Sequence, residues 1–329
     1  MKRSNTRWRV GIVGLGRAVN APGHSDGKAV LRHPAAVAGH PSLELVAAFD
    51  PDEQASRDFS RHWGAAAART WHELVDHRLD CLLIAAPTAV HAQYLADAIA
   101  TDIPVIVCEK PLTDDPSTAR HVIAAYKKAQ RTLHVFYPRR WISELEAVRL
   151  RMANGELGPL RGFTAYYGGG LRNIGCHVIE LVLRLLGPIE RAQARSSGYG
   201  AHDDPAPHLW LRLDSGVEGV MYAYQYSDYA MLEFDMLFQD GRIRLADLGF
   251  RLEHWHVVAS SRYAGYRELA LDRVENTDYG EAVRRFWMYV RDRGLAPTVD
   301  DWELAIMDVV HAGLQSLQSG RSVDVRSGD

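Results

Sequence analysis

The stretch WRVGIVGLG, residues 8–16, decides the fold of this 329-residue chain. It is a short apolar run that ends in Gly14-Leu15-Gly16. In a dinucleotide-binding fold the first glycine makes the tight turn after the first strand, and the second lets the backbone approach a pyrophosphate. Val19 stands where the third glycine of that fingerprint would be, so this motif alone is weak evidence.

Further apolar runs follow this stretch, and helical segments alternate with them. The runs are LELVAAFD (43–50), DCLLIAAP (80–87), VIVCEKP (105–111) and TLHVFY (132–137). Near-continuous apolar strands are typical of a parallel sheet that is covered on both faces. Helices are expected over residues 89–100 and 117–130, the second after the capping residue Asp115. This alternation predicts a doubly wound α/β domain.

Asp50 ends the second run, at the position where a dinucleotide-binding fold carries an acidic residue. A carboxylate there accepts hydrogen bonds from the adenine-ribose hydroxyls and repels a 2′-phosphate, which favours NAD over NADP. The alternative is an ordinary turn residue before Pro51.

The segment 17–40 is longer than this fold requires, because Asp50 stands 34 positions after Gly16 where about 20 are expected. We predict an inserted loop at the ligand-binding edge of the sheet, closing over the cofactor or substrate with Arg17 near phosphate. The alternative is a loop used only for subunit contact. Its histidines (His24, His33 and His40) lack a recognised metal spacing, so we expect them at the surface and expect no metal.

The second half of the chain predicts an α+β domain. Residues 143–155 are expected to form a helix with a capping box, Ser143 with Glu146. The strand candidates are FTAYYGG, PHLWLRLD, VEGVMYAYQY, YAMLEFDMLFQ and RIRLADL. Alternation in HLWLRL and RIRL favours an antiparallel sheet with one buried face. Helices over 278–293 and from 300 or 301 to 319 end the chain.

Composition limits the partners and the compartment. The net charge is −3 and no basic block stands out, so we expect neither nucleic acid nor a membrane surface as partner. The three cysteines have no metal-type spacing and cannot all pair within one chain, which fits the reducing cytoplasm. We recognise no signal peptide and no run of ~18 apolar residues.

The stretch GGGLRNIGCHVIELVLRLLG (168–187) places two polar residues in an apolar helix, Asn173 and His177. Four residues apart on a helix, they share one face. One reading is a pair of site residues. The other is a satisfied core histidine near an N-cap asparagine.

Several motifs together resemble the Gfo/Idh/MocA family of nicotinamide-dependent oxidoreductases. They are GLGR (14–17), AAPTAVH (85–91), CEKP (108–111) and the glycine-rich turn followed by NIGCHVIE (173–180). The resemblance implies a Rossmann domain over residues 1–135 and a substrate domain over 136–329, built on an open antiparallel sheet, with the C-terminal helices returning to the first domain. It implies NAD bound by Gly14, Gly16, Arg17, Asp50, Pro87, His91, Glu109 and Lys110, and we expect a homodimer or homotetramer.

In that family the lysine of the EKP motif and the later histidine meet in a cleft between nicotinamide and substrate, which here implies Lys110 and His177 as catalytic residues. The chemistry fits: histidine titrates near neutrality and can accept a hydroxyl proton, and a lysine ammonium can stabilise developing negative charge on oxygen. The alternative for Lys110 is a strand-end lysine paired with Glu109.

Asn173 departs from the family, in which many sugar and polyol members carry aspartate at this position. The NIG-x-H variant resembles members that oxidise C3 of nucleotide-linked N-acetylated sugars, which implies UDP-N-acetylglucosamine or a related UDP-sugar of lipid A or cell-surface diamino sugar biosynthesis. Arg140 and Arg172 are candidate substrate ligands, since guanidinium suits anions, or partners in exposed salt bridges between the domains. Alternative functions are a free sugar or inositol dehydrogenase, and a nucleotide-binding regulator without turnover.

Overall fold

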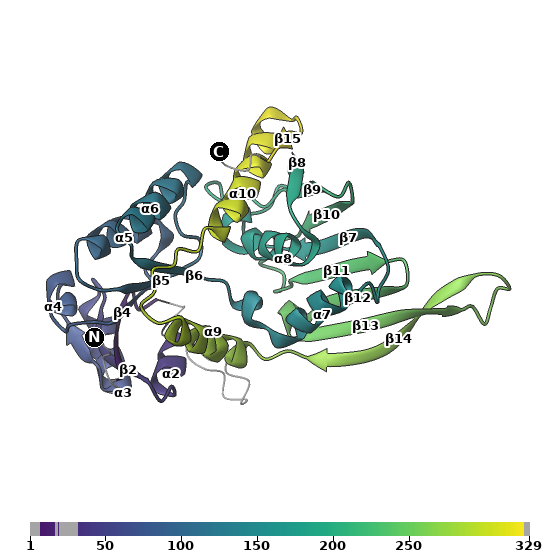
Figure 1. The fold of residues 1–329 in the computed structure, drawn as a ribbon. Coiled ribbons are helices and arrows are strands. Elements are labelled where there is room, and N and C mark those ends of the chain that lie inside the picture. The colour runs from purple at the N-terminus through teal and green to yellow at the C-terminus, as the bar shows by residue number, and fades with distance from the viewer. Residues whose placement is uncertain (1–6, 17–18, 20–31, 326–329) are drawn as a thin grey trace. The chain divides into compact units, whose positions relative to one another are not determined.

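The computed structural model describes residues 7–16, 19 and 32–325, and these form two compact units (Figure 1). The first unit comprises the described residues up to Trp141 together with Tyr279–Leu304. The second comprises Ile142–Asp278 and the described residues from Ala305 onward. Each unit is therefore assembled from two separate pieces of the chain.

A six-stranded parallel sheet forms the centre of the first unit, in the order β3-β2-β1-β4-β5-β6 (Figure 1). The strands are β1 (Trp8–Val13), β2 (Leu43–Phe49), β3 (Ala66–Ala68), β4 (Cys81–Ile84), β5 (Val105–Glu109) and β6 (Thr132–Phe136). The predicted doubly wound α/β domain is confirmed, with the switch in strand order between β1 and β4. Only β3, a short run of alanines, is absent from the sequence prediction.

Helices from the segments between these strands, and one from late in the sequence, lie in this unit. They are α2 (His33–Ala38), α3 (Glu53–Trp63), α4 (Trp71–Val75), α5 (His91–Ile99), α6 (Pro116–Lys128) and α9 (Tyr279–Arg293). The predicted cap of α6 is present, because the Thr118 N–H donates to Asp115 Oδ2 at 2.7 Å. The core joins the apolar strands to Phe286, Trp287 and Val290 of α9, so a helix from late in the sequence completes this unit.

The segment 17–40 differs from the predicted loop. Its last part forms α2, in which Pro34 follows the helix start and the side chains of Ala36 and Val37 are buried. His33 is only 2% exposed, so its predicted surface position is wrong. His40 is half-buried, and His24 lies outside the described residues.

The outer edge of β6 is covered by residues 296–300. The Leu133 N–H donates to the Thr298 carbonyl at 2.8 Å, and the Asp300 N–H donates to the Leu133 carbonyl at 3.0 Å. The Thr132 hydroxyl donates to the Ala296 carbonyl at 3.0 Å. This segment therefore satisfies backbone groups that a terminal strand would otherwise leave open.

Glu303 is a buried acid in the first unit, with 1% of its surface exposed. Its Oε1 accepts a hydrogen bond from the Leu112 N–H at 3.0 Å, two residues after Lys110. Burial raises the pKa of Glu303 to about 7, against the opposing effect of that hydrogen bond. The ionised form is therefore penalised only in the folded state.

We expect Glu303→Gln to stabilise the protein, and to do so more at pH 8 than at pH 5. Below the unfolded pKa both states are protonated, whereas stability is lost as pH rises towards the folded value of about 7. Glutamine keeps an acceptor for Leu112 without the charge, so its gain at pH 8 is on the order of 3 kcal/mol. Urea unfolding of the unaltered protein and of Glu303→Gln at both pH values measures this gain in unfolding free energy. An equal gain at pH 5 and pH 8 would contradict a raised pKa of Glu303.

The second unit is built on a nine-stranded sheet in the order β14-β13-β12-β11-β7-β10-β9-β8-β15 (Figure 1). Its strands are β7 (Leu160–Tyr167), β8 (Ile189–Arg195), β9 (His208–Leu213), β10 (Glu218–Ala223), β11 (Glu233–Phe238), β12 (Gly241–Ala246), β13 (Arg251–Ala259), β14 (Arg267–Asn276) and β15 (Val323–Asp324). The predicted α+β domain with a largely antiparallel sheet is confirmed, although β10 pairs with β7 in parallel.

The helices α7 (Ser143–Ala153), α8 (Cys176–Leu186) and α10 (Trp302–Ser319) complete the main elements. The predicted capping box at α7 is wrong, because Ser143 is the first helical residue and Ile142 occupies the capping position. The Ser143 hydroxyl donates instead to Glu144, and Glu146 pairs with Arg149 and Arg184. Within residues 7–16, 19 and 32–325, no helix combines the length and apolar character needed to cross a membrane.

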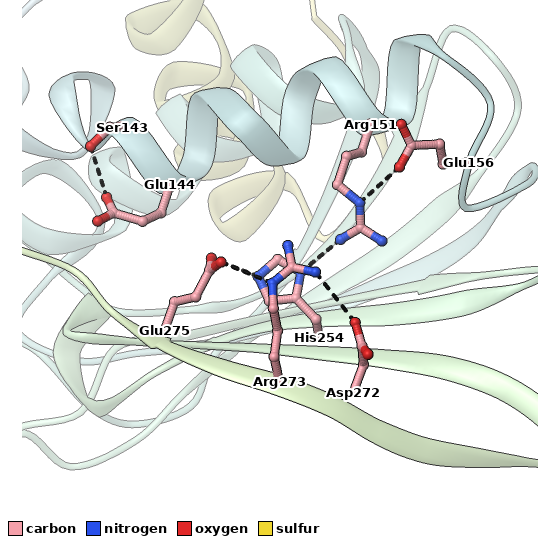
Figure 2. A network of polar contacts seen from close by, with 8 residues as sticks. All are labelled: Ser143, Glu144, Arg151, Glu156, His254, Asp272, Arg273 and Glu275. Atoms are coloured by element: carbon pink, nitrogen blue, oxygen red, sulfur yellow. Dashed lines mark hydrogen bonds and ion pairs between the residues drawn. The ribbon is translucent and has the colours of Figure 1, made fainter.

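A buried histidine that the sequence analysis did not consider joins α7 to the β13–β14 hairpin. Figure 2 shows His254 between Arg151 and Glu275. Arg151 Nη1 lies 2.8 Å from His254 Nδ1, and Nε2 lies 2.9 Å from Glu275 Oε2. An arginine can only donate, so Nδ1 accepts and the Nε2–H donates to Glu275. Burial lowers the pKa of His254 in agreement with this neutral form.

Candidate active site

The turn after β1 contains two glycines, Gly14 and Gly16. The packing of the described chain leaves no room for a side chain at the first, but it does not restrict the second. Gly14 has φ +87°, and a Cβ there would lie 2.3 Å from the Ala86 nitrogen at the end of β4. A Cβ at Gly16 would meet none of the described atoms within 4 Å. Packing within the described chain therefore explains the first glycine, and the open space at the second fits the close approach of a pyrophosphate.

Asp50 follows β2 and fixes this turn. Its Oδ2 accepts from the Leu15 N–H at 2.7 Å, and its Oδ1 accepts from the Asp52 N–H at 2.9 Å. The turn role and the cofactor role of Asp50 are compatible, because each carboxylate oxygen has a second lone pair. The arrangement holds the acid at the carboxyl end of β2, where a ribose would lie in a dinucleotide-binding fold.

We expect NAD to bind more tightly than NADP, and Asp50→Asn to narrow that difference on the order of 10-fold, about 1.4 kcal/mol. The amide retains an acceptor for the turn but removes the charge that faces a 2′-phosphate. Asp52→Asn is the matched control, because Asp52 is an exposed cap of α3. Calorimetric titration with both cofactors measures the ratio. Equal affinities of the unaltered protein for NAD and NADP would contradict this role of Asp50.

The loop after β4 carries Pro87, which is exposed, and His91, which is 1% exposed. His91 Nε2 lies 2.8 Å from the Ala86 carbonyl oxygen, and Nδ1 lies 2.9 Å from the Pro111 carbonyl oxygen. Both ring nitrogens are thus engaged within the first unit. His91 thus holds the loops after β4 and β5 together, and its contact with the cofactor stays a prediction.

Lys110 directly follows β5. Both carboxylate oxygens of the preceding residue, Glu109, take part in hydrogen bonds. Glu109 Oε1 lies 3.0 Å from His33 Nε2, and Oε2 accepts from the Lys110 N–H at 3.3 Å. Burial opposes ionisation, but the His33 hydrogen bond and the charge of Lys110 outweigh it and lower the pKa of Glu109. Lys110 is half-buried, and the peptide bond to Pro111 is cis.

The two arginines after β6 are engaged within the first unit. Arg140 Nη1 lies 2.7 Å from Asp300 Oδ2, and both side chains are mostly buried. Arg139 is buried with its guanidinium 5.3 Å from the centroid of the Tyr279 ring. The alternative in the sequence analysis, an exposed salt bridge between domains, is wrong for Arg140, because its salt bridge is mostly buried and lies inside one unit. Arg17 lies outside the described residues.

In the second unit, Gly170 and Asp204 shape the chain before His177. Asp204 Oδ1 accepts from the Arg172 N–H at 2.8 Å, and Oδ2 accepts from the Asn173 N–H at 3.0 Å. Gly170 has φ +93°, and a Cβ there would lie 2.1 Å from Asp204 Oδ2. Asp204 thus accepts hydrogen bonds from two backbone N–H groups at the start of this helical turn. Burial raises the pKa of Asp204, despite the opposing effect of these two hydrogen bonds. Sequence analysis missed Asp204 because it lies 31 residues from Asn173.

Asn173 and His177 do not lie on one regular helix. A π-helical turn spans Leu171–Gly175, and α8 begins only at Cys176. Asn173 is exposed and is not an N-cap, whereas His177 is 8% exposed. The spacing argument assumed 3.6 residues per turn, which a π turn exceeds. Arg172 Nη1 donates to the Asp203 carbonyl at 2.7 Å, so this guanidinium is already held near the turn.

The sheet order, the glycine turn and the acid after β2 are those of a dinucleotide-binding domain. Residues 8–137 match the family model GFO_IDH_MocA, described as an oxidoreductase family with an NAD-binding Rossmann fold. Over these residues the chain is similar to that family. As the sequence analysis predicted, the protein is a nicotinamide-dependent dehydrogenase, NAD(P)-dependent as its dehydrogenase relatives indicate.

Known relatives extend this match over more of the chain. The rhizopine catabolism protein MocA of Rhizobium meliloti is 25% identical over 66% of this chain and 71% of its own length. An inositol 2-dehydrogenase of Rubrobacter xylanophilus is 31% identical over 36% of this chain and 34% of its own length. The structure of the WlbA dehydrogenase of Bordetella pertussis, in complex with NADH and UDP-GlcNAcA, superposes with a TM-score of 0.76. It is 19% identical and covers 98% of this chain and all of that chain, and this similarity supports the fold in both units.

Proposed function

We propose that the enzyme oxidises a secondary hydroxyl group of a sugar with NAD, at C3 of UDP-N-acetylglucosamine or a related UDP-sugar. The observation that carries the reaction type is Lys110 at the carboxyl end of β5, beside the half-buried carboxylate of Glu109, in a domain that binds NAD. Ligands of such sheets bind at the carboxyl ends of the strands, so Lys110 stands at the edge where the chemistry takes place.

In this proposal His177 accepts the hydroxyl proton as the carbon–oxygen bond becomes a carbonyl. Lys110 donates a hydrogen bond to the same oxygen and stabilises the negative charge that develops on it. Bound NAD supplies the hydride acceptor. Gly16 and Asp50 would hold its pyrophosphate and adenine ribose, since one leaves open space and the other retains lone pairs.

The substrate assignment rests on the polar groups near His177. Asn173 is exposed, and its side-chain amide can both donate to and accept from a hydroxyl or an N-acetyl group. Arg172 is half-buried and can contact a phosphate through the donors that the Asp203 carbonyl does not occupy. Arg140, paired with Asp300, is the weaker phosphate ligand. The Bordetella relative supports a UDP-sugar because its structure contains UDP-GlcNAcA.

Free inositol or another free polyol is the second candidate substrate. The observation that favours it is the identity of 31% to the Rubrobacter inositol 2-dehydrogenase. A carboxylate is common at the position of Asn173 in enzymes for free sugars and polyols, and its absence here favours the UDP-sugar.

A substrate screen tests the proposal. The purified enzyme is incubated with NAD and UDP-N-acetylglucosamine, UDP-N-acetylgalactosamine, UDP-GlcNAcA or myo-inositol, and NADH formation is followed by absorbance. Reduction of the product with borodeuteride should place deuterium at C3, which identifies the oxidised carbon. Faster turnover of myo-inositol would assign the second candidate. Absence of NADH with every compound would refute both, and the variant His177→Ala controls for a contaminating activity.

A further inference from the structure

Two buried side chains and the half-buried Glu109, from distant parts of the sequence, form a line of hydrogen bonds that ends next to Lys110. The Trp287 Nε1–H of α9 lies 2.9 Å from His33 Nδ1 of α2. His33 Nε2 lies 3.0 Å from Glu109 Oε1, at the end of β5. All of these residues belong to the first unit.

The donors and acceptors along this line leave one arrangement of protons. An indole nitrogen can only donate, so His33 Nδ1 must accept. The proton of a neutral imidazole then resides on Nε2 and points at the Glu109 carboxylate, which can only accept when ionised. Trp287 thereby selects the tautomer of His33 that holds Glu109 as an anion.

Aromatic side chains surround His33 among the residues that the structure describes. The Phe136 ring packs edge-on at 4.4 Å between centroids, and Phe286 and Trp287 pack at 6.1 and 5.7 Å. The imidazole is 2% exposed and Trp287 is fully buried. The charged groups that act on Glu109 are Arg32 beside His33 and Lys110 beside Glu109 itself. Burial disfavours the ionised form of Glu109, and the His33 hydrogen bond is the largest of the interactions that oppose this effect and lower the pKa of Glu109.

We propose that His33 is a positioning residue of the active site, which holds the Glu109 carboxylate in place and thereby sets the charge environment and orientation of Lys110. Its role rests on the proposed function only in that Lys110 is taken as a catalytic residue. His33 itself touches neither substrate nor cofactor. Some hydrogen bonds orient an active-site group without contacting the substrate. Their loss commonly changes activity as strongly as the loss of that group's direct contacts.

The test uses the NAD-bound protein and measures the titration of Glu109 and the chemical reactivity of Lys110. Selective ¹³C labelling of glutamate carboxyls, with Glu109→Gln to assign the signal, follows the titration of Glu109. Acetic anhydride labelling with mass spectrometry follows the reactivity of Lys110 against pH. The variants are His33→Leu, which fills the space without a donor, and His33→Gln, which retains an N–H at about the reach of Nε2.

We expect His33→Leu to move the Glu109 titration upward by ~1 pH unit or more, because burial then acts without the hydrogen bond. The Lys110 labelling profile should shift as well, since the neighbouring carboxylate is then neutralised at a higher pH and is no longer held in place by His33. His33→Gln should restore both readings to nearly those of the unaltered protein. If His33→Leu leaves both titrations in place, or if leucine and glutamine disturb them equally, the positioning role is refuted.

Trp287→Phe tests the tautomer separately, because it removes only the donor to Nδ1 and keeps an aromatic ring in the core. We expect a smaller upward shift of Glu109 in this variant, and an unchanged titration would refute the selection by Trp287. These measurements need no substrate. A failed substrate screen with shifted titrations would reject the proposed function but retain the inference about His33. A successful screen with unchanged titrations would retain the proposed function and reject the inference.

Discussion

The variant His177→Ala is expected to lose turnover by ~10²–10⁴-fold, the usual effect of removing a general base. Its melting temperature should fall only slightly, because His177 lies at the start of α8 and the helix retains its apolar side chains. Lys110→Ala should lower kcat by ~10²–10³-fold, as expected when a donor to a developing oxyanion is lost. Lys110 is half-buried, so this second change should also leave the fold intact.

Cys176→Ala is the matched control for His177→Ala. Cys176 is the neighbouring residue on α8 and is 1% exposed, so its loss should reduce stability while sparing the rate. Melting temperature and kcat are measured on each variant. If His177→Ala behaves like Cys176→Ala, with lower stability and near-normal turnover, His177 is a core histidine and the proposed mechanism is wrong.

The second large effect is expected at Gly170. Alanine at this position would have its Cβ 2.1 Å from Asp204 Oδ2 and would adopt φ +93°, which L-residues avoid. Asp204 must then move away from the Arg172 and Asn173 N–H groups, and loss of the partly buried hydrogen bond from the Arg172 N–H costs about 1–3 kcal/mol. We expect Gly170→Ala to lose several kcal/mol of unfolding free energy, and the enzyme to lose activity with the displaced π-helical turn.

Gly64→Ala separates the two causes of this effect. Gly64 ends α3 with φ +71°, but a Cβ there meets none of the described atoms within 4 Å. Only the backbone conformation is penalised at Gly64, by about 1 kcal/mol. Urea unfolding of both variants gives the comparison. Equal losses at the two glycines would show that the contact with Asp204 is unimportant.

Local signals in the sequence were sufficient for much of the first unit. The run before Gly14, the acid at Asp50 and the Asp115 cap are each read from a few adjacent residues, because strand burial, turns and caps act over that distance. The same reasoning failed at β3, whose three alanines carry neither strand propensity nor alternation.

The features that could not be predicted depend on residues far apart in the sequence. His33 looked like a surface histidine because Glu109 and Trp287, which bury and bond it, lie in other elements. The π-helical turn before His177 depends on Asp204, which comes from a loop beyond β8. Pairing of this kind is set by tertiary structure, and periodicity along one segment contains no record of it.

The ribosome releases the chain from its N-terminus onward, whereas the first unit combines an early and a late part of the sequence. The strand β6 is released early, whereas residues 296–300, which cover its outer edge, leave the ribosome only after the whole segment Ile142–Asp278 has been made. Until then the nascent sheet presents an uncovered strand edge, the kind that pairs readily with other chains. A premature stop before Ala296 therefore leaves more than a shortened enzyme: it leaves a nucleotide-binding sheet that is prone to aggregate.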